Sequence, residues 1–168
     1  MHAENALVDY LISGITDAIQ KWRDDKDVYG LWLEVILGED DPKQAFLKHA
    51  WVLRARVTPK KEADKHRTKW AATLGETEAL NLCEDGWSAD GEEFPEYPGD
   101  PIGKQLRDDF FQQKRLQESG DELTWFLDIC GTVILRLHTE EVLIQLWGKP
   151  IPVGVVIGND MPHTLTLS

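Results

Sequence analysis

Positive charge, cysteine and long apolar runs are all scarce in this sequence. Lys and Arg number 18 against 30 Asp and Glu, so the formal net charge is −12. A field of that sign repels phosphate groups and anionic lipids, and we therefore expect no binding to nucleic acids or membranes. The same charge favours partners with a basic surface, and it also promotes plain solubility.

Cysteine occurs twice, at Cys83 and Cys130, and the two residues do not form a Cys-x-x-Cys pair. Each has apolar neighbours, which is typical of buried free thiols in a reducing compartment. Residues 1–9 lack the basic region and the apolar run of a signal peptide. No stretch reaches the roughly 18 uncharged apolar residues that a membrane span needs. These features predict a cytoplasmic protein.

Recognisable catalytic and metal-binding motifs are absent as well. The sequence contains no glycine-rich phosphate loop, no Gly-x-Ser-x-Gly nucleophile motif and no His-Glu-x-x-His zinc motif. Cys130 and His138 are expected on different faces of one helix, and Asp160 is interpreted as a turn residue. Trp87 and Ala89 occupy positions where a calcium loop needs oxygen ligands. We therefore expect no catalytic residue, no metal site and no cofactor, and hence no enzyme.

The chain does have enough apolar material for one core. Of its 168 residues 42% are hydrophobic, and they include seven Trp and five Phe. A chain of this length and composition can bury a core without disulfides or metals, and it normally forms one domain. We therefore expect residues 1–168 to be a single domain.

The first half of the chain is expected to contain helices and strands in alternation. Apolar residues at three- and four-residue spacing predict a helix over residues 3–23. β-forming side chains predict strands over residues 29–37 and 50–58, and their connection is too short for a crossover, so they should pair antiparallel. A polar helix over residues 60–74 and a third strand over residues 78–83 are expected to follow.

The C-terminal part is expected to be mainly helical. A helix over residues 102–118 should turn Leu106, Phe110 and Leu116 inward, and a second helix should begin after the N-cap residue Asp121. The remaining pattern predicts the end of that helix near residue 137, a helix over residues 139–147 that Gly148 stops, and a buried final strand over residues 153–157. These elements predict an α+β fold with a small, mainly antiparallel sheet packed against several helices.

Residues 84–100 form the most unusual stretch of the chain. They contain seven acidic residues and no basic one, together with three Gly and two Pro. This composition predicts a long loop, and long loops in compact domains are usually functional or disordered. Aromatic residues, which are enriched in protein interfaces, are interleaved with the acids. The residues that we expect to contact a partner are Asp85, Trp87, Asp90, Glu92, Glu93, Phe94, Glu96 and Tyr97.

A basic segment precedes the acidic one. Residues 48–69 contain eight basic residues and two acidic ones. In one interpretation the acidic loop folds back over this segment and is screened by it. In the other, the loop faces outward, and its carboxylates speed the encounter with a basic protein such as a nuclease, whose active site attracts phosphate. The sequence is compatible with both.

The order of the expected elements has a counterpart in known proteins. An amphipathic helix opens the chain, a strand Tyr-Gly-Leu-Trp-Leu-Glu-Val follows, and the neighbouring strand ends in Arg-Val-Thr-Pro. Helices and a strand after Trp-Gly-Lys complete the pattern. This layout resembles that of bacterial immunity proteins of polymorphic or contact-dependent toxin systems, over most of the chain but without a specific motif. The resemblance implies a cytosolic protein that binds and neutralises one cognate toxin.

Two other classes of function also fit the sequence. One is an enzyme or ligand-binding domain with a pocket between the sheet and the helices, and the other is a structural adaptor in a larger complex. The neighbouring gene would discriminate between these classes. A toxin-like reading frame would favour an immunity protein, and a metabolic operon would favour an enzyme.

Overall fold

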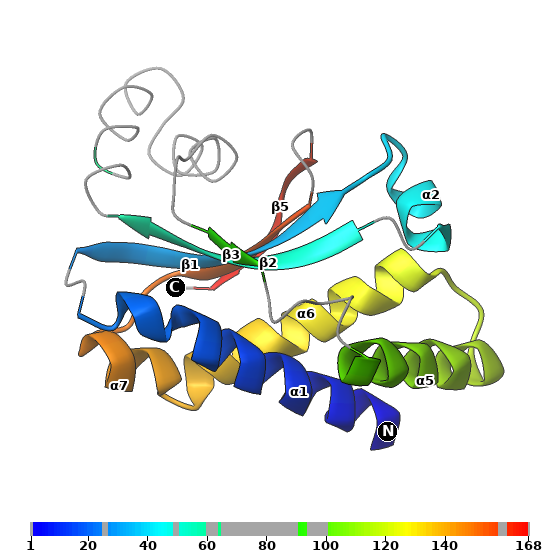
Figure 1. Ribbon diagram of the computed structural model, residues 1–168, viewed down its shortest axis with the longest axis horizontal. Helices are drawn as coiled ribbons and strands as arrows, with labels where there is room; N and C mark the ends of the chain where they lie inside the picture. The colour runs from blue at the N-terminus through cyan, green and yellow to red at the C-terminus, as the bar shows by residue number, and fades with distance from the viewer. Residues whose placement is uncertain are drawn as a thin grey trace.

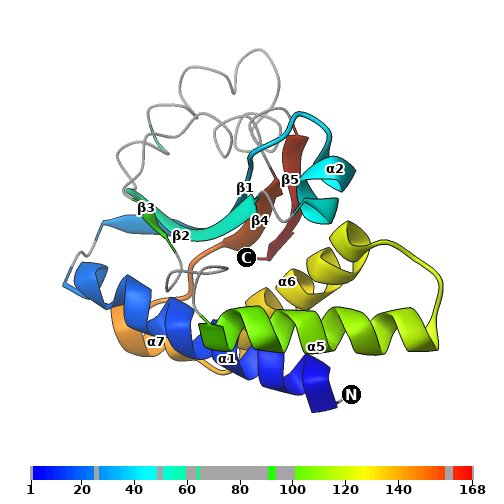
Figure 2. The same ribbon diagram turned by 45° about the vertical axis from the view of Figure 1, so that its right-hand side comes forward.

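A five-stranded sheet with helices over one face forms the body of the molecule (Figure 1). The computed structural model describes residues 2–24, 27–48, 51–59, 64, 91–93, 101–157 and 161–167. The strand order is β3-β2-β1-β4-β5. Figure 2 shows the same two layers after a turn of 45°, with the helices on one side of the sheet.

The opening helix is confirmed. Helix α1 (His2–Ile19) continues into a short 3-10 helix, η1 (Gln20–Trp22). Leu7, Leu11 and Ile15 are fully buried, as their four-residue spacing predicts. The apolar stripe of α1 therefore faces the core, and its polar side chains cover the outside of the helical layer.

The antiparallel pair of strands is confirmed too. Strand β1 (Val28–Leu37) pairs antiparallel with β2 (Trp51–Pro59), and the short helix α2 (Pro42–Leu47) lies between them in sequence. On the other side of β1, strand β4 (Val153–Ile157) runs parallel to it.

The expected fold class needs correction. We expected a small, mainly antiparallel sheet, but the sheet is mixed, because the pair β1 and β4 at its centre is parallel. Helices also account for more of the described residues than strands do. Strand β4 is not the last strand, since β5 (Met161–Leu167) follows it and pairs with it antiparallel. The parallel pair arises because the chain passes through the helical layer before it returns to β1, and such a crossover gives a parallel strand.

Helix α5 (Pro101–Gln117) confirms the helix expected at this place, but one inward residue was wrong. Phe110 is buried and Leu106 is partly buried, whereas Leu116 is 83% exposed. The buried stripe consists instead of Gly103, Arg107, Phe110 and Phe111. The stripe ends before the last turn, because the end of the helix projects beyond the core.

Helix α6 (Glu122–Thr139) begins as expected, with Asp121 as its N-cap. The Oδ1 atom of Asp121 accepts hydrogen bonds from the backbone N–H of Thr124 at 2.9 Å and from the Thr124 hydroxyl at 3.1 Å. The backbone hydrogen bond is the main cause that holds the pKa of the Asp121 carboxyl below its usual value.

Replacing Asp121 with alanine is therefore expected to lower the free energy of unfolding by about 1 kcal/mol at neutral pH. Because the pKa of Asp121 is lower in the folded chain than in the unfolded one, its contribution is complete above about pH 5 and is lost as the pH falls below about 4. Urea unfolding of both proteins between pH 3 and pH 7 measures this. Asp121→Asn is the control, since its amide caps the helix at every pH. A difference that stays constant down to pH 3 would exclude the ionised cap.

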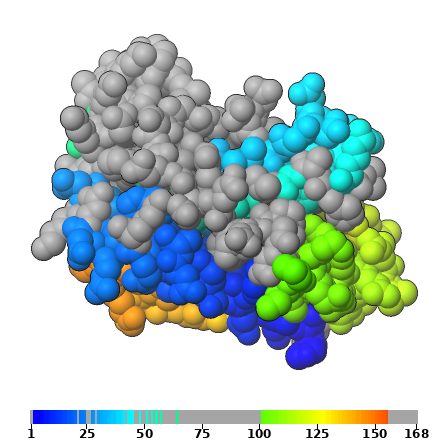
Figure 3. Space-filling view, in the orientation of Figure 1, coloured from blue at the N-terminus to red at the C-terminus, as the bar shows by residue number. Residues whose placement is uncertain are grey.

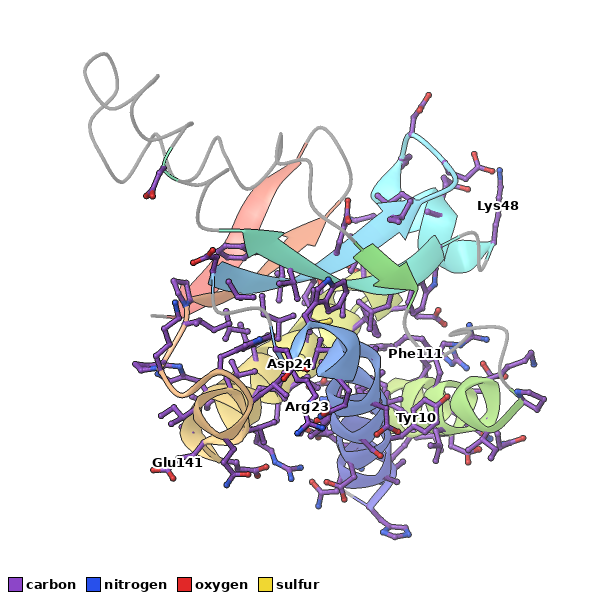
Figure 4. All side chains as sticks on the ribbon, turned by 60° about the vertical axis from the view of Figure 1, so that its left-hand side comes forward. Tyr10, Arg23, Asp24, Lys48, Phe111 and Glu141 are labelled. Carbon is purple, nitrogen blue, oxygen red and sulfur yellow. The ribbon has the colours of Figure 1, made fainter. Side chains whose placement is uncertain are left out.

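The break after α6 lies slightly later than expected. Thr139 still belongs to α6, and the direction changes at Glu141, whose φ of 58° lies in the left-handed region. Helix α7 (Val142–Trp147) then ends at Gly148, which has a φ of 71° as a helix-terminating glycine often does. In Figure 4 the labelled Glu141 lies at the outer side of α7 and points away from the body of the molecule.

The core lies between the sheet and the helical layer. Trp51 of β2 and Phe126 of α6 are in ring contact across it, with centroids 4.5 Å apart. Figure 4 shows Tyr10 of α1 and Phe111 of α5 at the contact between those two helices. The indole N–H of Trp147 donates to the backbone oxygen of Trp22 at 2.9 Å, which ties α7 to the end of the first helix.

Two expected elements lie outside the described residues. These are the third strand over residues 78–83 and the polar helix over residues 60–74, except for Asp64, which is helical. Cys83 is also outside them. Among the helices that the structure describes, none is both long and apolar enough to cross a membrane.

Candidate functional site

The structure places two of the expected partner-binding residues. Glu92 and Glu93 lie in the short strand β3 (Gly91–Glu93). Residues 91–93 are thus a strand, which corrects the expectation that the acidic segment of residues 84–100 is a loop throughout. The other expected residues lie outside the described ranges: Asp85, Trp87, Asp90, Phe94, Glu96 and Tyr97.

Strand β3 joins the acidic segment to the basic one. It pairs antiparallel with β2, with Glu93 opposite Arg54 and Gly91 opposite Arg56. Among the described strands β3 is at one edge of the sheet and has a neighbour on one side only. The middle of the acidic segment is therefore fixed beside the basic strand and at the rim of the sheet.

A third charged residue continues the same row across the sheet. Glu34 of β1 is directly opposite Arg54, so that Glu93, Arg54 and Glu34 occupy adjacent positions on three neighbouring strands. Glu34 is only 7% exposed. A buried carboxylate is costly unless charged or polar groups compensate it.

Glu34 marks a second buried face of the sheet. Leu33 and Val35 alternate with it along β1 and belong to the core under the helices. Trp32, two residues before Glu34, is 1% exposed but is not part of that core. Sequence reasoning missed this face because it predicted a strand over residues 29–37 from its β-forming side chains and did not assign its two faces. The single acid within that strand was the signal that could have revealed it.

Nucleophiles and metal ligands do not assemble in the described part of the chain. Cys130 is a free thiol with no exposed surface, and burial raises its pKa well above the usual value, so it is not a thiolate at neutral pH. No group of three or more potential metal ligands occurs among the described residues. Asp160 lies outside them, and no described contact joins Cys130 to His138.

The described surface includes two cavities lined mainly by residues of the helical layer. One, of about 310 Å³, lies where α2 meets the turn between α5 and α6, and its described lining is Lys43, Arg115, Gly120, Asp121, Glu122, Leu123 and Trp125. The other, of about 230 Å³, lies between the end of α1 and α7 and is lined by Thr16, Gln20, Arg23, Val142, Gln145 and Leu146. Neither described lining includes a cysteine, serine or histidine.

Charged groups that line the larger cavity stabilise the helices around it. Asp121 caps α6, and Arg115 donates to Glu122 at 2.5 Å, which links the end of α5 to the start of α6. The low pKa of Asp121 makes its carboxylate a poor general base at neutral pH. Comparison of the chain with protein-family models, with curated proteins and with solved structures finds no match.

Proposed function

We propose that this chain is a protein-binding domain that receives a basic partner on its acidic segment, residues 84–100. In this proposal it acts as a cytoplasmic immunity protein and neutralises one cognate bacterial toxin. The observation that supports it best is the position of β3. Two acids of the segment, Glu92 and Glu93, lie on an edge strand, where a partner can approach without opening the core.

The charge balance supports a basic partner. The chain carries a net charge of −12, and the acidic segment contributes seven acids without a base. Carboxylates around aromatic residues speed the encounter with a cationic surface and then give it rigid contacts. A nuclease-type toxin presents such a surface, because its active site must attract phosphate.

The row formed by Glu93, Arg54 and Glu34 supports an anchored segment. Opposite charges at directly opposed positions of neighbouring strands stabilise a sheet by a few tenths of a kcal/mol to about 1 kcal/mol. An anchored segment loses less conformational entropy on binding than a free one. The buried free thiol of Cys130 agrees with a reducing compartment, and thus with the cytoplasm.

Co-expression with the product of the neighbouring gene tests this function. The chain should restore growth of cells that produce that protein, and the two should purify as a stable complex. The control is the chain with Glu92→Lys and Glu93→Lys, which keeps the helical layer but reverses two charges of β3 and should rescue growth less well. Absence of both rescue and complex with the unaltered chain would refute the immunity function.

A further inference from the structure

The larger cavity, which we call the corner pocket, has features of a binding site that the proposed function does not use. It opens between α2 and the turn from α5 to α6, away from β3 in sequence and in the fold (Figure 1). Figure 3 shows that α2 and α5 both reach the molecular surface on the right-hand side of the view. Its volume of about 310 Å³ is at the lower end of the range for ligand pockets, about 300–1,000 Å³.

The wall of the corner pocket is aromatic. Trp125 is only 5% exposed, and Leu123 is partly buried against the core beside it. Gly120 allows this arrangement, because a Cβ atom at that position would lie 2.8 Å from Nε1 of the Trp125 indole. A small exposed part of the Trp125 indole and Leu123 therefore line the pocket, and aromatic rings pair well with an indole.

The rim of the pocket is charged but largely neutralised. Arg115 is bound to Glu122, and Oδ1 of Asp121 is taken by Thr124. Lys43 lines the same pocket as Asp121, and its charge contributes to the low pKa of the Asp121 carboxyl. Since these groups compensate one another, the part of a ligand that enters between them is uncharged.

The surroundings of the mouth are acidic. The two segments that form it, residues 39–48 and 114–122, each contain three acidic and two basic residues. The chain as a whole carries a charge of −12. Basic residues of a partner that flank an uncharged guest are therefore attracted to the acidic mouth.

We propose that the corner pocket binds an aromatic side chain that projects from a basic segment of a partner protein. The inference rests on the proposed protein-binding function and adds a second contact to it. Buried aromatic anchors of this kind dominate the binding energy of protein interfaces. An indole wall, a rim whose charges compensate one another and an acidic surround together select this class of guest.

Three blocked tripeptides test the pocket without the natural partner. Acetylated and amidated Lys-Phe-Lys should shift the NMR signal of the Trp125 indole N–H, with a dissociation constant on the order of millimolar. Trp125→Phe assigns that signal by removing it. The peptides Lys-Ala-Lys and Glu-Phe-Glu should shift it much less, because one lacks the ring and the other has the wrong charge. Equal shifts from Lys-Phe-Lys and Lys-Ala-Lys would overturn the proposal.

A pair of variants on α2 tests whether the peptide binds in the corner pocket. Lys43→Trp puts a bulky ring at the mouth and should weaken Lys-Phe-Lys binding at least about tenfold. Gln44→Trp is the matched control, since the neighbouring Gln44 is exposed on the same helix and is not among the described lining residues. Equal binding by both variants would overturn the proposal. The peptide series on the unaltered chain remains decisive if either variant fails to fold.

The same variants separate this inference from the proposed function. If the neighbouring gene product binds the unaltered chain and Lys43→Trp equally well, the pocket is not a partner contact, although the protein-binding function stands. If that product does not bind at all but Lys-Phe-Lys still shows its preference, the immunity function fails and the pocket's selectivity stands.

Discussion

Replacing Phe126 with alanine is expected to lower the free energy of unfolding by about 3–5 kcal/mol. Phe126 has no exposed surface, and its ring lies 4.5 Å from that of Trp51, with the two planes inclined by 51°. The contact joins α6 to β2 and therefore holds the helical layer against the sheet. The substitution removes apolar surface, leaves a cavity and loses the aromatic pair at once.

Urea unfolding monitored by circular dichroism measures this effect. Leu116→Ala is the matched control, because it also truncates a large apolar side chain on a C-terminal helix but at a position that is 83% exposed. Its effect should stay within about 0.5 kcal/mol. Similar losses for the two variants would contradict the arrangement of the core.

Neutralising four acids of residues 84–100 is expected to slow association with the basic partner by about tenfold or more at low ionic strength. The variant carries Asp85→Asn, Asp90→Asn, Glu92→Gln and Glu93→Gln. Its dissociation rate should change less, because long-range charge acts mainly on the encounter. Stopped-flow or surface-binding kinetics at two salt concentrations measure both rates, and the difference from the unaltered chain should shrink at high salt.

A second charge variant separates the local effect from that of net charge. Asp17, Asp24, Asp109 and Asp128 are acids of the helical layer or its turns, and changing all four to Asn alters the total charge by the same amount. Association should then slow less than with the acidic-segment variant. Equal rates for the acidic-segment variant and the unaltered chain would exclude steering by this segment. A large loss of its stability would instead show that the acids chiefly balance the basic strand β2.

Local features of the fold were predictable because short-range physics determines them. The spacing of Leu7, Leu11 and Ile15 defines α1 without any knowledge of its neighbours. Asp121 was recognisable as a cap from its position before an apolar helix, and Gly148 as a stop from its place after one. The short connection between β1 and β2 likewise left antiparallel pairing as the simple solution.

Long-range features were not predictable from the same signals. Nothing in the local pattern of β4 shows that it lies beside β1, more than a hundred residues earlier, and the pair made the sheet mixed. Leu116 fits an apolar helical stripe, yet the core ends before the last turn of α5 reaches it. Arg107 lies in the buried stripe of that helix, where its guanidinium is held by Asp108 at 3.0 Å.

The candidate site likewise has features that the sequence predicts and features that it does not. The acidic and basic segments were visible from composition alone, and the placement of Glu92 and Glu93 on a strand was not. Their register with Arg54 and Glu34 depends on pairing between strands far apart in sequence. The corner pocket depends on contacts between α2 and α6, which no local sequence pattern predicts.

Hydrogen–deuterium exchange of the chain, free and bound to the product of the neighbouring gene, tests the acidic-surface account most directly. Backbone amides within residues 84–100 should exchange more slowly when the partner is bound. A stable complex in which those amides exchange as fast as in the free chain, with protection only over the helical layer, would contradict it.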